Sequence, residues 1–274
     1  DHLWTGLVLF MVANYGYQSA LVFYNSMLPS ISRGSHVGLV SGYGVALGYL
    51  GSIAGMKLVQ PFVESGGRSL AFLPTAGLLL FFSLPCFLFV KDAETRTTPS
   101  FRIKEAFHRL KETFLRARQY RSLFRFILIH FLVLDAVNTI IAFMSVYANK
   151  VIGFSDGQII KFLISSTVGA MIGSLIIGIL VKYKGVILSY WLVLALWIVA
   201  LSLTAISQSE TLFWVVGPIA GIGMGGVWVV SRAFIIELSP PEKVGEFFGL
   251  SGFAGKAASI LGPMLWGMVV WTLN

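Results

Sequence analysis

Long apolar runs, separated by short polar or glycine-containing breaks, make up most of the sequence. A bilayer core of about 30 Å needs about 20 apolar residues per helix, and eight runs approach or exceed that length. The expected membrane-spanning helices are Leu3–Pro29, Gly38–Val63, Ser69–Val90, Leu123–Asn149, Gln158–Val181, Val186–Ser207, Thr211–Phe234 and Phe247–Leu273. The pattern therefore predicts an all-α polytopic membrane protein with eight transmembrane helices.

Composition agrees with this interpretation. The chain is 56% hydrophobic and only 12% charged, whereas soluble proteins carry about 25% charged residues. This deficit excludes a cytosolic enzyme and a secreted disulfide scaffold, and the single cysteine, Cys86, can form no intrachain disulfide. Because the chain begins with Asp1 rather than Met, we interpret it as a fragment or a processed form.

Residues 91–122 differ from the rest of the chain. They hold nine Lys and Arg against four Asp and Glu. Their apolar residues recur at helical spacing: Phe101, Ile103, Phe107, Leu110 and Phe114. This pattern is typical of an amphipathic helix on an anionic inner leaflet, although a solvated linker helix explains it better than a specific lipid sensor does. We expect a cytoplasmic linker between a helical part at 1–90 and another at 123–274.

The net charge of +8 becomes informative once the basic residues are placed. If 91–122 is cytoplasmic, alternation of the spans puts fourteen basic residues inside and leaves only Arg68 and Lys150 outside. The inner residues beyond the linker are Arg33, Lys182, Lys184, Arg232 and Lys243. This distribution satisfies the positive-inside rule and places the N-terminus outside. The charge is therefore a topology signal, and we expect no nucleic-acid partner.

Three spans precede the linker and five follow it. Many transporters pair two six-helix halves. Three further helices before Asp1 and one after Asn274 would complete twelve, so the eight spans are interpreted as helices four to eleven.

Several stretches, taken together, resemble the major facilitator superfamily and within it the vacuole-effluxer-like branch, which includes autophagy-related vacuolar amino-acid exporters. They are Phe23–Pro29, Ser41–Gly51, Leu134–Thr139 with Tyr147–Ala148, Pro241–Gly249, Gly255–Ser259 and Gly262–Pro263. The resemblance implies a transporter, not an enzyme, that exports a small solute, with amino acids as the first guess. It implies a multi-pass protein of the plasma membrane in a prokaryote or of a vacuolar-type membrane in a eukaryote. Rival interpretations are a non-transporting receptor or assembly subunit and, less favoured, a lipid-acting enzyme.

The superfamily carries a short basic loop twice, and the second copy corresponds here to a gating loop with Gly178, Lys182 and Gly185. Lys182 stands where the superfamily usually has an acid, which argues against a charge-relay role at that position.

Ionisable residues inside a membrane span are costly and point to function. Asp135 and Lys256 lie about twelve and about ten residues from the cytoplasmic ends of their runs, which places both ~15–18 Å deep. We predict that they form a pair or an alternating gate, with a purely structural ion pair as the alternative. Asn138 and Thr139 share the helical face of Asp135. Asp135 is also the candidate for proton coupling.

Polar residues on one face of the first run complete the candidates for solute binding: Asn14, Tyr17, Gln18 and Asn25. Amide and phenol groups suit a zwitterionic solute, although packing between helices would also explain them. His130 lies ~140° around its helix from Asp135, which makes it a weak relay candidate. The glycines between 217 and 226 indicate close helix packing, and no spacing indicates a metal, a cofactor or a catalytic cluster.

Overall fold

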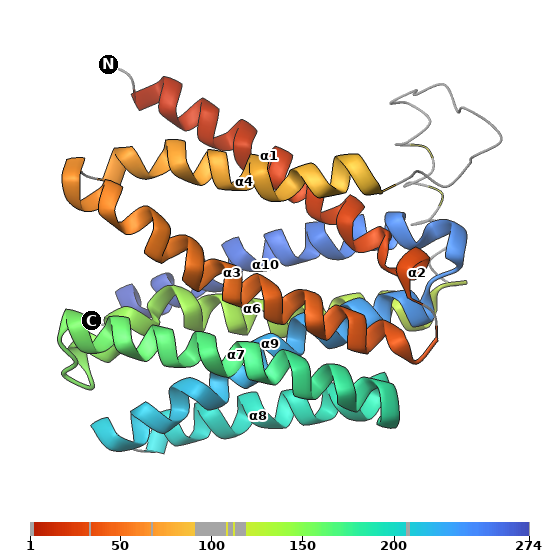
Figure 1. Ribbon diagram of the computed structural model, residues 1–274. Coiled ribbons are helices and arrows are strands. Elements are labelled where there is room, and N and C mark those ends of the chain that lie inside the picture. The colour runs from red at the N-terminus through yellow and green to blue at the C-terminus, as the bar shows by residue number, and fades with distance from the viewer. Residues whose placement is uncertain are drawn as a thin grey trace. The chain divides into compact units, whose positions relative to one another are not determined.

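The computed structural model describes residues 3–32, 34–66, 68–90, 108, 112, 119–206 and 209–273. Every regular element in these ranges is a helix, which confirms the all-α fold. The elements are α1 Leu3–Ser26, α2 Leu28–Ile31, α3 His36–Gly66, η1 Arg68–Ala71, α4 Phe72–Phe89, α6 Arg121–Lys150, α7 Asp156–Lys184, α8 Val186–Ile206, α9 Glu210–Leu238, η2 Pro241–Lys243 and α10 Val244–Leu273 (Figure 1).

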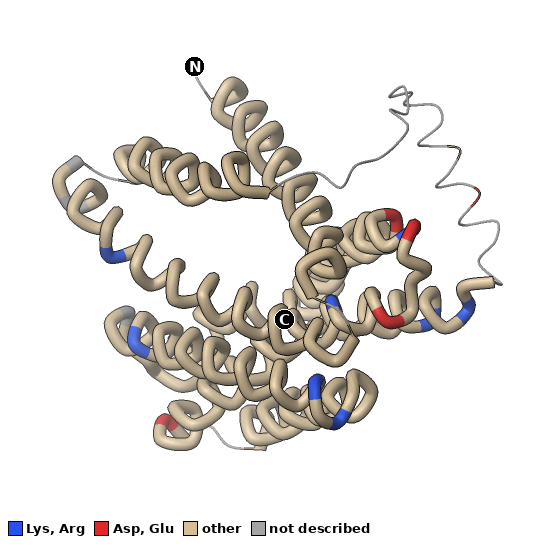
Figure 2. Tube along the Cα trace, turned by 45° about the vertical axis from the view of Figure 1, so that its right-hand side comes forward, with Lys and Arg blue, Asp and Glu red and all other residues tan. Residues whose placement is uncertain are grey.

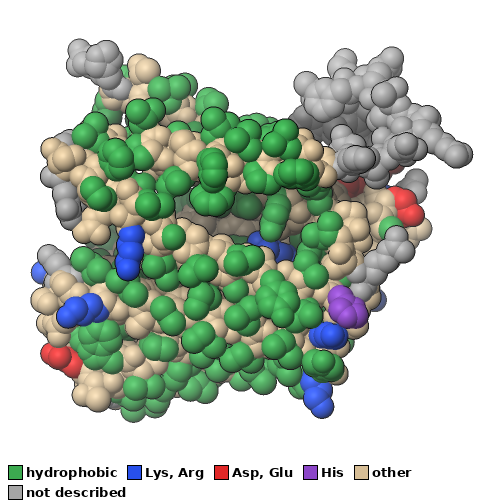
Figure 3. All heavy atoms as spheres, viewed as in Figure 1, with side chains coloured by type: hydrophobic (Ala, Val, Ile, Leu, Met, Phe, Trp, Pro, Cys, Tyr) green, Lys and Arg blue, Asp and Glu red, His purple; other side chains and the backbone are tan. Residues whose placement is uncertain are grey.

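Eight helices among the described residues are long and apolar enough to cross a membrane. They coincide with the eight predicted runs, and most bounds agree within a few residues. Long stretches of the helices carry no charge, and most charged residues lie near helix ends (Figure 2). Hydrophobic side chains cover the visible face of α7 and α8 (Figure 3). Trp191 and Ile198 of α8, for example, are 67% and 64% exposed. Such a surface is suited to lipid rather than to water.

The helices divide into two compact units, residues 1–46 with 115–274 and residues 47–114. The boundary between the units falls inside α3. Most of the expected linker, residues 91–122, lies outside the described residues, including its apolar positions at 101, 103, 107, 110 and 114. The amphipathic helix and the division into 1–90 and 123–274 therefore stay predictions.

In the first unit, α9 packs against α7 and α8, while α10 packs against α6 and α1 (Figure 1). The contact between α7 and α9 is the most extensive of all the helix pairs. Glycines make it close: a side chain at Gly221 would overlap the carbonyl oxygen of Ser166, and one at Gly225 would overlap that of Ala170. This arrangement confirms that the glycines of α9 serve helix packing.

An aromatic cluster closes one end of the first unit. Phe162 of α7 stacks on Phe213 of α9 with ring centroids 4.7 Å apart, and Phe154 lies edge-on to both. The preceding turn is ordered by Asn149, whose amide donates to the Phe154 carbonyl at 3.0 Å. Ser155 then begins α7 through a reciprocal capping box with Gln158. These contacts fix the positions of α6, α7 and α9, which carry or support the cavity described next.

Candidate substrate site

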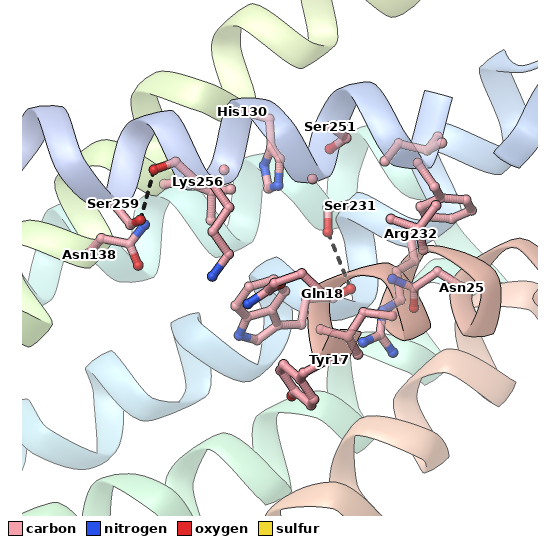
Figure 4. Close-up of a pocket in the computed structure, with 18 residues that line it drawn as sticks. Tyr17, Gln18, Asn25, His130, Asn138, Ser231, Arg232, Ser251, Lys256 and Ser259 are labelled. Atoms are coloured by element: carbon pink, nitrogen blue, oxygen red, sulfur yellow. Dashed lines mark hydrogen bonds between the residues drawn. The ribbon is translucent and has the colours of Figure 1, made fainter. Parts of the chain in front are cut away.

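A cavity of about 280 Å³ lies in the first unit, between α1, α6, α9 and α10 (Figure 4). Its volume lies near the lower end of the range for ligand pockets and suits a small solute. All four of these helices contribute polar side chains to the wall. These are Tyr17, Gln18 and Asn25 from α1, His130 and Asn138 from α6, Ser231 and Arg232 from α9, and Ser251, Lys256 and Ser259 from α10.

The α1 wall contains three of the four residues predicted on that helix. Gln18 and Asn25 are seven residues apart, two turns of the helix, and therefore lie on the same side of it, and Tyr17 precedes Gln18 and borders the same cavity. Gln18 and Asn25 are half-buried, and the Asn25 Oδ1 atom is buried without a hydrogen-bond partner in the described part of the chain. Asn14 is exposed and lies outside the lining.

The α10 wall presents Lys256 to the cavity. Its ammonium group points into the open space (Figure 4). No ion pair or hydrogen bond of this group is found among the residues that the structure describes. The neighbouring Ser259 hydroxyl donates to the Lys256 carbonyl at 2.8 Å. Lys256 was predicted as a substrate or coupling residue; it lines the cavity, and its role stays a prediction.

Asp135 occupies a different place from Lys256. A side chain at Gly262 of α10 would lie 2.8 Å from Asp135 Oδ1, so this carboxylate sits at the contact between α6 and α10. The Oδ1 atom is buried and has no hydrogen-bond partner among the described groups. Thr139 lies at the same contact and donates its hydroxyl to the Asp135 carbonyl at 2.8 Å. Neither residue lines the cavity.

The expected pair of Asp135 and Lys256 is therefore not formed between the described atoms. Gly262, which faces Asp135, follows Lys256 by six residues on α10. At ~1.5 Å and 100° per residue the two positions are ~9 Å apart along α10 and lie on different sides of it, so Lys256 is directed away from the contact that holds Asp135. Asn138 of α6, predicted as a candidate on the same helical face as Asp135, by contrast lies in the cavity wall.

His130 lines the cavity although it was ranked as a weak candidate. It is only 3% exposed, and its Nδ1 atom lies 3.4 Å from the Tyr190 hydroxyl of α8. Its ring stacks on Phe126 with centroids 5.4 Å apart. His130 and Asp135 do lie on different sides of α6, as their angular separation predicts.

Arg232 is the main residue that sequence reasoning missed. We expected it in an inner connection, but it lies within α9, six residues before the last residue, Leu238, and lines the cavity. Trp228 and Ser231 line the cavity from the same face. The signal was present in the sequence, because Arg232 falls inside a predicted apolar run rather than after it.

The electrostatic character of the cavity follows from its lining. Two basic residues, Arg232 and Lys256, contribute to the wall, and its lining contains no Asp or Glu. Within the described ranges no three His, Cys, Asp or Glu residues are close enough to hold a metal ion. Lys256, whose ammonium group faces the open space, can therefore attract an anionic group and donate hydrogen bonds to it.

The predicted gating loop lies outside the cavity and is mostly helical. Gly178 and Lys182 belong to α7, and only Gly185, with φ 82°, forms the turn to α8. Residues 182–184 continue the helix because none of them is a helix breaker, and Gly185 ends it by adopting a left-handed conformation. Gly178 lies close to α3, where an added side chain would approach Gly38 O at 2.9 Å. The gating role of these residues stays a prediction.

Apolar membrane-spanning helices around a small polar cavity define a transporter-like helical membrane protein. The family profile described as "Vacuole effluxer Atg22 like" matches residues 1–271 of the chain, and the chain belongs to this family. The resemblance found in the sequence is thereby confirmed, and the family is one of transporters rather than enzymes.

Two individual relatives agree with this family assignment. The MFS-type transporter YxiO of Bacillus subtilis is 31% identical over 97% of this chain and 64% of its own length. Autophagy-related protein 22 of Kluyveromyces lactis is 22% identical over 96% of this chain and 61% of its own length. The chain thus spans less than two thirds of the length of these relatives.

Proposed function

We propose that the protein is a secondary active transporter that moves a small solute across the membrane by alternating access to the cavity. The observation that carries this proposal is the clustering of polar side chains from α1, α6, α9 and α10 around one cavity, inside helices that are otherwise apolar. Polar and ionisable groups in membrane spans are costly, and they commonly mark a substrate or ion pathway.

Amino-acid efflux is the activity that we propose first. The family description names an effluxer, and the related yeast protein is named as autophagy-related. The amide groups of Gln18, Asn25 and Asn138 can both donate and accept hydrogen bonds, and Lys256 can bind a carboxylate. A cavity with these groups suits a solute that carries both an amino and a carboxyl group.

Residues 91–122 are proposed to join the two helical halves, 1–90 and 123–274, on the cytoplasmic side. Their basic residues would contact anionic lipids of the inner leaflet. Alternating access would then consist of the two halves rocking about the cavity, as in transporters with internal repeats.

Asp135 is proposed as the proton-coupling residue. Its carboxylate is buried at the contact of α6 and α10, where Gly262 allows the two helices to approach closely. A separation of these helices during transport would expose the carboxylate to water. Binding and release of a proton at Asp135 would then be linked to the conformational change.

Flux measurement in proteoliposomes tests the proposal. The protein, produced with the whole chain that its gene encodes, would be reconstituted and supplied with a panel of labelled amino acids. We expect saturable flux that exceeds that of empty vesicles and is inhibited by an excess of unlabelled substrate. Binding without flux would overturn the transporter proposal and favour a receptor.

A further inference from the structure

We propose that His130 of α6 is a solute-binding residue whose Nε2–H group donates a hydrogen bond to a carboxylate of the solute, and that the Tyr190 hydroxyl of α8 holds the imidazole in the tautomer that this requires. The inference rests on the proposed function, because it assumes that the cavity is the substrate site. It goes further by assigning a new binding residue. It also assigns a positioning residue on α8, a helix whose residues all lie outside the cavity lining.

The imidazole of His130 has a single hydrogen-bond partner among the residues that the structure describes. Its Nδ1 atom lies 3.4 Å from the Tyr190 hydroxyl, and that hydroxyl has no other partner in the same ranges. The Nε2 atom has no described partner, and it is not one of the described polar atoms that are both unpartnered and sealed from solvent. The ring points into the cavity (Figure 4). Nε2 is therefore the nitrogen that a bound solute meets.

The surroundings of Tyr190 decide which nitrogen of His130 carries the proton. Tyr190 is only 7% exposed and lies outside the cavity lining. If Nδ1–H donated to the phenol oxygen, the Tyr190 O–H group would be a buried donor without an acceptor, which is unfavourable. If Tyr190 O–H donates to Nδ1, the proton of the neutral imidazole lies on Nε2, where water or a solute can accept it. The second arrangement leaves no buried donor unpaired, so Nε2 is a donor toward the cavity.

The imidazole is neutral in this arrangement. An imidazolium carries a proton on both nitrogens and cannot accept a hydrogen bond from Tyr190. The described contacts of the ring are to Phe126 and Tyr190, and the cavity lining contains no Asp or Glu. Within the described ranges no carboxylate therefore stabilises a positive charge on this ring.

Aromatic packing fixes the orientation of the ring. His130 stacks on Phe126 at an interplanar angle of 11°, and Phe126 stacks in turn on Phe234 of α9 with centroids 4.3 Å apart. Tyr190 lies edge-on to both phenylalanines, with centroids at 5.7 Å and 5.9 Å. The stack and the hydrogen bond restrain the imidazole in two different directions. A donor held in this way loses little conformational freedom when it binds a solute.

A carboxylate is the acceptor that fits this donor best. Hydrogen bonds to a charged acceptor are stronger than those to a neutral one. The ammonium group of Lys256 points into the same cavity from α10, and its charge favours an anionic group there (Figure 4). The solute carboxylate would then contact Lys256 and His130. The amide oxygens of Gln18 and Asn25 would stay available to accept from an amino group.

Calorimetry on the detergent-solubilised protein, produced with the whole chain that its gene encodes, tests the role of His130. The probes are alanine, glutamine and glutamate. His130→Phe keeps an aromatic ring on Phe126 but removes both nitrogens, and it should weaken binding about tenfold or more. His130→Gln places an amide N–H group near the position of Nε2 and should retain binding within about threefold. Equal affinities of the wild type and His130→Phe would overturn the inference.

Nitrogen NMR of the protein with isotopically labelled histidine tests the role of Tyr190, because it distinguishes a protonated from an unprotonated ring nitrogen. Wild-type His130 should carry its proton on Nε2, with its signals assigned by their absence from His130→Gln. Tyr190→Phe should give signals averaged between the two tautomers and should weaken solute binding by about threefold to tenfold. A proton on Nδ1 in the wild type, or a spectrum that Tyr190→Phe leaves unchanged, would refute the assignment.

Tyr147→Phe is the matched control. The Tyr147 hydroxyl of α6 donates to the Thr204 carbonyl of α8 at 3.2 Å, and Tyr147 lies outside the cavity lining. The change removes a phenol hydrogen bond between α6 and α8, as Tyr190→Phe does, but leaves the site untouched. It should preserve solute affinity and the His130 signals, and a loss of affinity equal to that of Tyr190→Phe would count against a positioning role. Thermal unfolding would show that every variant is folded.

The outcomes separate the inference from the proposed function. Flux of the probes in proteoliposomes that His130→Phe leaves unchanged would overturn the inference while supporting the transporter. Binding that His130→Phe weakens, without flux, would support the inference and overturn the transporter. The absence of both binding and flux for all three probes would overturn both.

Discussion

The close contact between α7 and α9 gives a prediction whose magnitude can be derived from the structure. A methyl group added at Gly173 of α7 would lie 2.5 Å from the Cα atom and 2.6 Å from the carbonyl oxygen of Ile222 in α9. Ordinary van der Waals contact begins at about 3.4 Å, so Gly173→Ala requires the helices to separate by about 0.9 Å. The atoms involved belong to the backbone and cannot rotate away. Packed helices move apart as a whole when such a methyl is inserted.

We expect Gly173→Ala to destabilise the protein by about 1–3 kcal/mol, the usual cost of overpacking a well-packed core. A gap of 0.5–1 Å also forfeits a quarter to a half of the dispersion attraction across it. For a chain of this size a loss of 1 kcal/mol lowers the Tm by about 2–4 °C, so the expected decrease is about 2–12 °C. Thermal unfolding of the purified protein in detergent measures this change.

Gly267→Ala provides the matched control. Gly267 lies in α10 with no atom within 4 Å of the position that a side chain would occupy. The substitution should leave the Tm unchanged or raise it slightly, because alanine favours a helix over glycine by about 1 kcal/mol. A Tm for Gly173→Ala equal to or above that of the wild type would show that the contact is not tight, and the packing argument would fail.

Three further predictions concern the site and its support. Asp135→Asn should remove the pH dependence of flux while changing solute affinity by less than about threefold; undiminished, pH-dependent transport by this variant would refute proton coupling at Asp135. Asn25→Ala should weaken solute binding by about threefold to tenfold, the equivalent of one neutral hydrogen bond, and Asn14→Ala should not, as calorimetry can show. Equal effects of the two changes would argue against the cavity as the binding site. Ser155→Ala should lower stability by about 1 kcal/mol through loss of the α7 cap, and an unchanged Tm would contradict the role of that cap.

The transmembrane helices could be predicted from sequence because bilayer thickness sets their length and apolar residues mark them. The ends of the helices were harder to predict. A helix continues as long as its backbone N–H and C=O groups form hydrogen bonds with each other, whether or not its side chains are apolar. The run predicted to end at Phe234 continues to Leu238, and the helix ends just before Pro240. Arg232 lies inside the predicted run, two residues before its end, and it was assigned to a connection only because a basic residue so close to the end of a run was taken as a topology signal.

The site was only partly predictable for a related reason. Helical periodicity correctly placed Tyr17, Gln18 and Asn25 on one face, because angular position within a helix follows from sequence. Which faces of different helices meet depends on packing. Asp135 and Lys256 were predicted at similar depth, yet Gly262 draws Asp135 into a helix contact and away from Lys256. The local approach of two backbones at a glycine cannot be read from one sequence.

The packing of α9 has a mechanical consequence. Along α9, the backbone of one face is held against α7 by glycine contacts, while another face supplies Arg232 to the cavity. At Gly221 and Gly225 the two backbones are so close that α9 cannot turn about its axis or slide along α7 without first separating from it. The attachment point of Arg232 in the cavity wall is therefore tied to α7, and α7 and α9 would have to move as one body in any rearrangement of the cavity.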